Sequence, residues 1–422
     1  MGKYLLAYDL TIHEKTLRRD GLRKSDFRFN SDLSSKSKLN SILARSVKIG
    51  ETGFSALNLG KSSFGGKPTY KLKNFSDELV LRLISKNIQR LTGVRQSNRM
   101  AIAKAMNSLL QEGFDCRIYK LDIKSFYENV CITEILKNLD SDSGFSRSSF
   151  AILETFFEEL KQQQVAGLPR GVALSATLAE FVMRTFDENA ISNSDVFYYA
   201  RFVDDIFIIT SSRENPANFL KELKKNLPSG LQFNARKTKH YELLERPAKK
   251  TEAPAEQIEF NFLGYNFNVH QRQKNDLGTK RNVHIDISQS KTNKIKTKVI
   301  RSFIQFCRDG DWDDLIGRLK LLTGNYVIFD HARGIRRKAG IYYNYQMVDV
   351  SSSISLPQLD NFLKSFVLSK QGKLCSELRL NLNDSQRRTI LKLSFVRGFR
   401  NRDFYHFTAT DLVRLMGCWK YA

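Results

Sequence analysis

The chain has 422 residues, enough to form a large hydrophobic core divided among two or three packed subdomains. Its 68 lysines and arginines outnumber 44 aspartates and glutamates, and the formal net charge of +24 indicates a polyanionic partner. The five cysteines are scattered without a CxxC pair and the six histidines lack ligand spacing, which argues against a disulfide framework or a zinc site and fits a reducing cytoplasm. We expect no membrane span and no signal peptide.

Residues 1–76 are basic and polar, and we interpret them as an N-terminal extension whose helices pack on the rest of the chain. Within it, Gly65-Gly66-Lys67 resembles part of a phosphate-binding loop. That interpretation is rejected, because Lys61 stands where the motif needs glycine and Pro68 where it needs serine or threonine.

Two helices are predicted next, over residues 77–91 and 98–111, because their apolar residues recur at helical spacing and Gly93 offers a stop for the first. Arg95 and Arg99 lie between them. We interpret these two arginines as solvent-exposed charges, and the alternative is contact with a phosphate group of a substrate.

Residues 197–210 predict two buried strands joined by a turn that carries the adjacent acids Asp204 and Asp205. An ordinary hairpin turn is the simple alternative, since aspartate favours turns. However, the turn lacks the glycine or asparagine that tight hairpins prefer. Two neighbouring carboxylates also raise each other's pKa unless a cation neutralises them, and oxygen ligands of this kind suit Mg²⁺. The hypothesis therefore needs a third carboxylate.

Asp122 supplies that carboxylate, at the end of a strand predicted over residues 117–122. Alternation places Tyr119, Leu121 and Ile123 on one face of the strand and Asp122 on the other. Ser125 and Glu128 form the S-x-x-E pattern of a capping box, which predicts a helical turn directly after the acid. A single aspartate at a strand end is more often a turn residue, so its interpretation depends on the hairpin.

Three further segments complete the pattern. Gly167-Leu-Pro-Arg-Gly171 predicts a flexible loop, which is followed by a helix with Leu174 and Leu178 on one side. Residues 231–240 predict a loop with a basic cluster, and residues 245–258 a surface connection. Residues 260–267 then predict a short aromatic hairpin around Gly264.

In this order the segments resemble the palm of reverse transcriptases, with motif A near 117–128, B at 167–186, C at 197–210, D at 231–240 and E at 259–267. The segments Gly167–Gly171, Leu322–Tyr326 and Gly340–Asn344 are similar to those of the bacterial antiphage-defence reverse transcriptases of the "unknown group" class, which are related to retron enzymes. Two residues depart from the family pattern: Phe202 replaces the usual tyrosine, and Arg170 replaces a frequent glutamine. No fingers hairpin of the retroviral type is evident.

The resemblance implies an α+β right-hand polymerase with an antiparallel-sheet palm, helix-rich fingers with the N-terminal extension, and a helical thumb. The expected domains are the extension (1–76), fingers and palm (77–284) and a basic thumb (285–422). Asp122, Asp204 and Asp205 would be the catalytic residues and would hold two Mg²⁺ ions, with Mn²⁺ as an alternative. The expected partners are dNTPs, a noncoding template RNA and an RNA/DNA hybrid.

The resemblance also assigns the binding residues. Nucleotide contacts would come from Tyr127, an aromatic gate against the 2′-hydroxyl, from Arg170, and from Lys237, a proton donor to pyrophosphate. Tyr127 could instead be a core residue, and Lys237 part of a plain phosphate-binding loop. The primer grip would be Phe262, Leu263 and Gly264, and the nucleic-acid-binding residues of the thumb would be Lys294, Lys298, Arg301, Arg336 and Arg337.

Two other functions stay open at the level of sequence. The chain could be a non-catalytic RNA-binding module of polymerase shape, or a polymerase that works without a template or synthesises RNA. An intron maturase fits less well, since nothing after the thumb resembles an endonuclease. The sequence leaves template identity, priming and oligomeric state undetermined.

Overall fold

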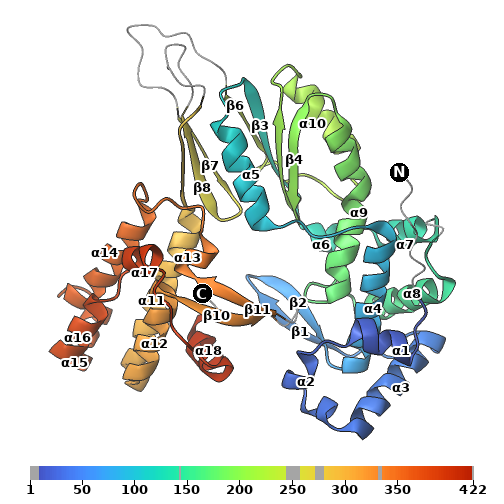
Figure 1. Cartoon of the computed structure of the whole chain (residues 1–422), viewed down its shortest axis with the longest axis horizontal. Coiled ribbons are helices and arrows are strands. Elements are labelled where there is room, and N and C mark those ends of the chain that lie inside the picture. Colours follow the sequence, from blue (N-terminus) through green and yellow to red (C-terminus); the bar gives the residue numbers. More distant parts are fainter. Residues whose placement is uncertain (1–8, 142–143, 244–256, 271–279, 331–334, 421–422) are drawn as a thin grey trace. The chain divides into compact units, whose positions relative to one another are not determined.

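The computed structural model describes residues 9–141, 144–243, 257–270, 280–330 and 335–420. They form two compact units, and the chain passes between them more than once (Figure 1). Unit 1 contains residues 1–99 and 115–243, and unit 2 contains residues 100–114 and 244–422. The expected boundaries after residues 76 and 284 differ from this division and stay a prediction. No helix in the described part of the chain is long and apolar enough to cross a membrane.

Unit 1 is built on a four-stranded antiparallel sheet with the strand order β4-β5-β3-β6. Its strands are β3 (Cys116–Asp122), β4 (Val196–Phe202), β5 (Asp205–Thr210) and β6 (Lys239–Leu243). Figure 1 shows α9 (Ala173–Ser192) and α10 (Pro216–Lys225) beside this sheet. Tyr119, Leu121 and Ile208 are fully buried in one core together with residues of α9, so the predicted inward face of β3 is correct.

The remaining elements of unit 1 precede and follow β3. A two-stranded hairpin is formed by β1 (Leu59–Phe64) and β2 (Lys67–Leu72). The helices are α1 (Glu14–Thr16), the π-helical η1 (Leu17–Gly21), α2 (Asp26–Phe29), the 3-10 turn η2 (Ser31–Ser34), α3 (Lys36–Thr52), α4 (Phe75–Thr92), α6 (Phe126–Asn129), α7 (Ile132–Ser141) and α8 (Arg147–Gln162). The first predicted helix corresponds to α4, which ends at Gly93 in the left-handed conformation.

Two expectations about unit 1 need correction. The extension is not purely helical, because its last part forms the β1–β2 hairpin. The first strand of the hairpin predicted over residues 197–210 is also less buried than its apolar sequence predicted: β4 is an edge strand of the described sheet, and Phe197 remains 54 % exposed. An edge strand packs against one neighbour only, so its apolar side chains are not enclosed on both sides.

Unit 2 combines helices with two small antiparallel sheets. The strands are β7 (Gln257–Phe262), β8 (Tyr265–His270), β9 (Val283–Ile287), β10 (Asn325–Asp330) and β11 (Ile335–Gly340). The helices are α5 (Arg99–Gln111), α11 (Gln289–Asp309), α12 (Trp312–Thr323), α13 (Ile341–Asn344), α14 (Ser355–Leu368), α15 (Lys373–Asn381), α16 (Asp384–Leu391), α17 (Phe395–Arg400), α18 (Ala409–Met416) and the 3-10 turn η3 (Gly417–Trp419). The predicted helix 98–111 is α5, and the predicted aromatic hairpin is β7–β8.

Asn325 joins the two C-terminal segments that carried part of the family resemblance. It is fully buried, and its side chain donates to the carbonyl oxygens of Gly398 and Asp403 and accepts from the Tyr342 amide. The Ile341 amide donates to the carbonyl of Gly324 at 3.0 Å. Leu322–Tyr326 and Gly340–Asn344 therefore form one local structure, although they are separated in sequence.

Candidate active site

The palm sheet places three carboxylate residues at one end of two neighbouring strands. Asp122, the last residue of β3, lies opposite Asp205, the first residue of β5. Beyond this pair the Ile123 amide donates to the carbonyl oxygen of Asp204 at 3.0 Å. Residues more than 80 positions apart in the chain thus meet at a single sheet end because the strand register requires it.

The turn between β4 and β5 has only two residues, Val203 and Asp204, since Phe202 pairs directly with Asp205. Val203 adopts a φ of 61°, in the left-handed region. A β-branched side chain rarely occupies this region, and the conformation costs about 1–3 kcal/mol. Valine thus occupies the turn position where glycine would be unstrained. The surrounding structure must stabilise this conformation of Val203.

The carboxylates repel one another. Burial raises the pKa of Asp205 to about 6, and the charges of Asp204 and Asp122 contribute to the shift. The pKa of Asp204 is raised by burial and by Asp122, while Lys67 and Arg170 oppose the shift. A site with this balance of charge favours a bound cation.

Lys237 currently neutralises part of this charge. Its Nζ donates to Oδ1 of Asp122 at 2.7 Å, and Asn234 Nδ2 donates to Oδ2 at 3.2 Å. The hydrogen bond to Asp122 raises the pKa of Lys237. The Lys237 side chain is 60 % exposed, so it can leave Asp122 without disturbing the core.

The three aspartates do not form a metal site in the conformation described. Over the described ranges, no three histidine, cysteine, aspartate or glutamate side chains are grouped as a metal site. In this conformation Asp122 uses both of its oxygens for Lys237 and Asn234. The donor chemistry nevertheless fits Mg²⁺, which prefers carboxylate oxygens, once the Asp122–Lys237 ion pair opens.

Tyr127 lies on α6, just beyond Asp122, and contacts Arg170. The Arg170 guanidinium is 4.7 Å from the centre of the Tyr127 ring. Arg170 also forms a two-pronged ion pair with Glu128, at 2.8 and 3.0 Å. The predicted capping box is therefore wrong: α6 forms, but Ser125 makes no capping bond and Glu128 is engaged by Arg170. Burial raises the pKa of Tyr127.

The glycine-containing loop before α9 holds Tyr127 from the other side. Leu168 N donates to the carbonyl of Tyr127 at 2.8 Å. Gly167 has a φ of +59°, and a Cβ there would overlap the backbone of Tyr127 and Glu128. Only glycine allows this approach, so the loop packs directly on the backbone of α6.

The β1–β2 hairpin adds a residue that the sequence analysis did not select. Tyr70 N on β2 donates to the Arg170 carbonyl at 2.7 Å, which ties this hairpin to the loop. Lys67, the first residue of β2, is exposed. Its charge opposes the rise in the pKa of Asp204, and it adds to the effect of Arg170, which lowers the pKa of Glu128. The Gly65-Gly66 turn was the signal for this hairpin, but it was considered only as a phosphate-loop motif.

The other predicted binding residues belong to unit 2. Leu263 and Gly264 form the β7–β8 turn, both with positive φ, and Phe262 is buried. On α11, the Lys298 ammonium lies 5.2 Å from the Trp419 ring, and burial lowers its pKa, so Lys298 is less available to nucleic acid than the exposed Lys294. Arg336 and Arg337 are exposed on β11. Most of the predicted connection 245–258 lies outside the described residues.

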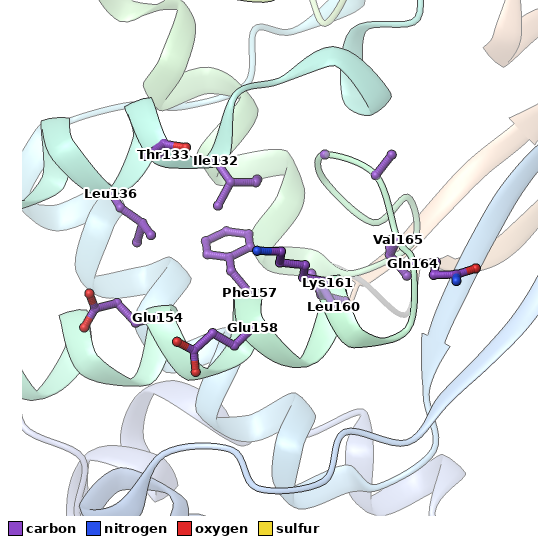
Figure 2. Close-up of a pocket in the computed structure, with 12 residues that line it drawn as sticks. Ile132, Thr133, Leu136, Glu154, Phe157, Glu158, Leu160, Lys161, Gln164 and Val165 are labelled. Atoms are coloured by element: carbon purple, nitrogen blue, oxygen red, sulfur yellow. The ribbon is translucent and has the colours of Figure 1, made fainter.

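A cavity of about 590 Å³ lies behind the loop, between α7 and α8. Figure 2 shows Ile132, Leu136 and Phe157 directed into it. None of the three aspartates lines this cavity, so it is separate from the carboxylate site.

The four-stranded sheet of unit 1 thus carries three carboxylates at one end of β3 and β5. Residues 68–267 match the family model "Reverse transcriptase (RNA-dependent DNA polymerase)". The matched segment, just under half of the chain, has the mixed helices and antiparallel sheets of a reverse transcriptase domain. No curated protein matches the chain significantly.

Two solved structures are similar at low identity. Apo telomerase from Candida tropicalis, truncated from its C-terminal domain, has 13 % identity and a TM-score of 0.33 over 55 % of this chain and 58 % of that one. Telomerase from Candida albicans, in complex with a fragment of telomeric RNA, has 13 % identity and a TM-score of 0.35. The match covers 90 % of this chain and 61 % of that one. The chain thus spans about three fifths of the length of these structures.

Replacing Asp205 by asparagine is expected to stabilise the metal-free protein at neutral pH. Folding raises the pKa of Asp205 from 3.8 to about 6, so the folded state binds this proton more tightly and loses stability as pH rises between those values. In EDTA, the thermal midpoint of Asp205→Asn should exceed that of the wild type by a few degrees near pH 7.5, since about 1 kcal/mol corresponds to roughly 2–4 °C. The difference should shrink near pH 5.

Asp140→Asn, which changes an exposed aspartate on α7, is the control and should leave the midpoint unchanged at both pH values. A lower midpoint for Asp205→Asn near pH 7.5 would show that the carboxylate is stabilised in the folded protein, contrary to this description of the site.

Proposed function

We propose that the protein is an RNA-directed DNA polymerase that copies a structured noncoding RNA into cDNA, in the cytoplasm of a bacterium and as part of antiviral defence. The observation that carries the polymerase assignment is the meeting of Asp122, Asp204 and Asp205 at one end of β3 and β5 within a reverse transcriptase domain. The segments 167–171, 322–326 and 340–344 support the defence assignment, because they resemble that class of enzyme.

In the proposed reaction the primer 3′-hydroxyl loses its proton to water, and its oxygen forms a bond to the α-phosphorus of a dNTP. The bond from this phosphorus to the oxygen that bridges it to the β-phosphate breaks, and pyrophosphate leaves with that oxygen. Asp122, Asp204 and Asp205 would hold two Mg²⁺ ions, which when bound activate the primer hydroxyl and neutralise charge on the phosphates. The protein's own contribution is to fix the three carboxylates on adjacent strands, where no loop movement is needed to assemble them.

Lys237 has two successive roles in this proposal. It neutralises Asp122 before substrate binds, and its exposed side chain is then released toward the leaving pyrophosphate, to which an ammonium can donate a proton. If Lys237 never leaves Asp122, the same ion pair favours the alternative function, a non-catalytic RNA-binding module.

Tyr127 would face the sugar of the incoming nucleotide. The Arg170 guanidinium packs on its ring and the loop at Gly167 packs on its backbone, and both contacts restrain the position of the ring. A fixed aromatic ring can exclude a 2′-hydroxyl by contact, which gives selection of dNTPs over rNTPs.

Lys67 would contact the triphosphate, and the exposed basic residues of unit 2 would contact the phosphates of the template RNA or hybrid. Contacts of the second kind give binding that weakens steeply with salt. Arg336 and Arg337 on the exposed strand β11 and Lys294 on α11 are the candidates with the most accessible side chains.

The double variant Asp204→Ala, Asp205→Ala should abolish dNTP incorporation on a primed RNA template with Mg²⁺, because two of the three proposed metal ligands are lost. Incorporation is measured by primer extension. Binding of the primed template, measured by fluorescence anisotropy, serves as the control and should change less than about threefold. Retained incorporation would exclude these residues as the catalytic centre.

Tyr127→Ala should admit ribonucleotides. The discrimination against rNTPs, taken as the ratio of kcat/KM values for a dNTP and the matching rNTP, should fall by roughly 10- to 100-fold, since loss of a steric contact of this size is worth about 1–3 kcal/mol. Tyr127→Phe, which keeps the ring, should retain the selectivity. Unchanged selectivity in Tyr127→Ala would make this tyrosine a packing residue.

Lys67→Ala should raise the KM for dNTPs by about tenfold, since one charge contact to phosphate is worth about 1.5–3 kcal/mol at most, with little effect on affinity for primed template. Lys71→Ala is the matched control, because Lys71 is exposed on the same face of β2, four residues further from the turn. Equal effects of the two substitutions would contradict a specific triphosphate contact.

A further inference from the structure

Arg201, on β4, is a buried cation directly behind the catalytic turn. Its side chain is 4 % exposed. It forms ion pairs with two carboxylates of α9: Nη2 lies 2.7 Å from Oε2 of Glu180 and 2.7 Å from Oδ2 of Asp187. Burial alone would lower the pKa of Arg201, but the bonds to Asp187 and Glu180 outweigh burial and raise it. The guanidinium is therefore permanently charged and fully engaged.

The same guanidinium also binds the turn. Nη1 of Arg201 donates to the carbonyl oxygen of Val203 at 3.1 Å. Val203 is the residue with the strained φ of 61°, and it directly precedes Asp204. A strained conformation persists only where neighbouring groups fix it. Arg201 supplies a fixed donor at that point, so the carbonyl of Val203, and with it the peptide plane leading to Asp204, has a defined orientation.

The two carboxylates are themselves well anchored. Asp187 accepts from Nε of Arg201 at 2.8 Å and also from the hydroxyl of Tyr199, which lies two residues earlier on β4. Glu180 and Asp187 are on α9, which begins shortly after the loop that contains Arg170 and contacts Tyr127. Arg201 thus links the turn that carries Asp204 to the helix that carries the loop at the nucleotide gate.

Buried ion pairs often add little net stability, because desolvation of the charges offsets their attraction. A stabilising role alone would thus be served equally well by apolar residues on β4 and α9. What an apolar side chain cannot supply is a hydrogen-bond donor to Val203 that keeps the turn in its strained form.

We propose that Arg201 is a positioning residue for the polymerase reaction, which uses Glu180 and Asp187 as anchors to hold the Val203–Asp204 turn and so sets the place of the Asp204 carboxylate. This inference rests on the proposed function. It adds to that function a residue that touches neither substrate nor metal and acts through the backbone of the turn.

Arg117 provides a matched control for the test. It is a second buried arginine of the same sheet, with ion pairs to Glu214 at 2.7 Å and Glu242 at 2.8 Å. It lies on β3 opposite Thr210, five residues before Asp122, which corresponds to about 17 Å along a strand. Arg117→Lys therefore disturbs a comparable ion-pair network at the opposite end of the strands.

The experiment compares Arg201→Lys with Arg117→Lys in the full-length protein. Lysine keeps the charge but cannot donate to Glu180, Asp187 and Val203 together. Thermal midpoints, primer extension and Mn²⁺ binding followed by electron paramagnetic resonance are measured for both. We expect the two variants to lose thermal midpoint to a similar extent. Only Arg201→Lys should show a fall in kcat, of roughly 10- to 100-fold, with its KM for dNTP changed by less than about threefold. Only Arg201→Lys should bind Mn²⁺ more weakly.

Glu180→Gln is the second variant, in case Arg201→Lys does not fold. It removes one anchor but leaves the pair with Asp187, so it should reduce kcat and Mn²⁺ affinity in the same direction and by a smaller factor. The inference would be overturned if Arg201→Lys had the same kcat and the same Mn²⁺ affinity as Arg117→Lys. If only Glu180→Gln folds, the same comparison is made between Glu180→Gln and Arg117→Lys. Absence of polymerisation by the wild type would instead overturn the proposed function, and the two failures are therefore distinct.

Discussion

Repulsion among three carboxylates at the end of β3 and β5 is the constraint on which the rest of the site depends. The strand register leaves no freedom in this arrangement, because Asp122 and Asp205 are direct neighbours across the sheet and Asp204 follows from the two-residue turn. Burial is the main cause of the raised pKa values of Asp204 and Asp205, and this repulsion adds to it. The nearby cations, Lys237 above all, offset this negative charge.

Around this charged centre the protein uses rigid supports. Arg201 binds the strained turn from behind, and the loop at Gly167 fixes Tyr127 through backbone contacts that a larger residue would prevent. Lys237 is different, since its bond to Asp122 is made by an exposed side chain. Fixed acids with one movable counter-charge form a site that is stable without metal and can still open for it.

Much of this site could be predicted from the sequence, because the acids lie next to strongly patterned strands and their order along the chain is informative. Alternation on β3 correctly placed Tyr119 and Leu121 in the core. The capping box failed because Glu128 has a charged partner, Arg170, 42 positions away, and a local pattern cannot report a distant one. The β1–β2 hairpin was missed because its strands are polar and exposed, with no alternation to detect, and the network around Arg201 was missed because its partners on α9 are distant in sequence.

The central claim is that the three aspartates share divalent ions after Lys237 leaves Asp122. The most direct test is a structure of the protein with primed RNA template, a non-hydrolysable dNTP and Mn²⁺, located by anomalous scattering. The account predicts Mn²⁺ at about 2 Å from carboxylate oxygens of Asp122 and Asp204, with Asp205 completing the group and the Lys237 ammonium moved away from Asp122. An intact Lys237–Asp122 ion pair with no metal among the three aspartates would contradict it.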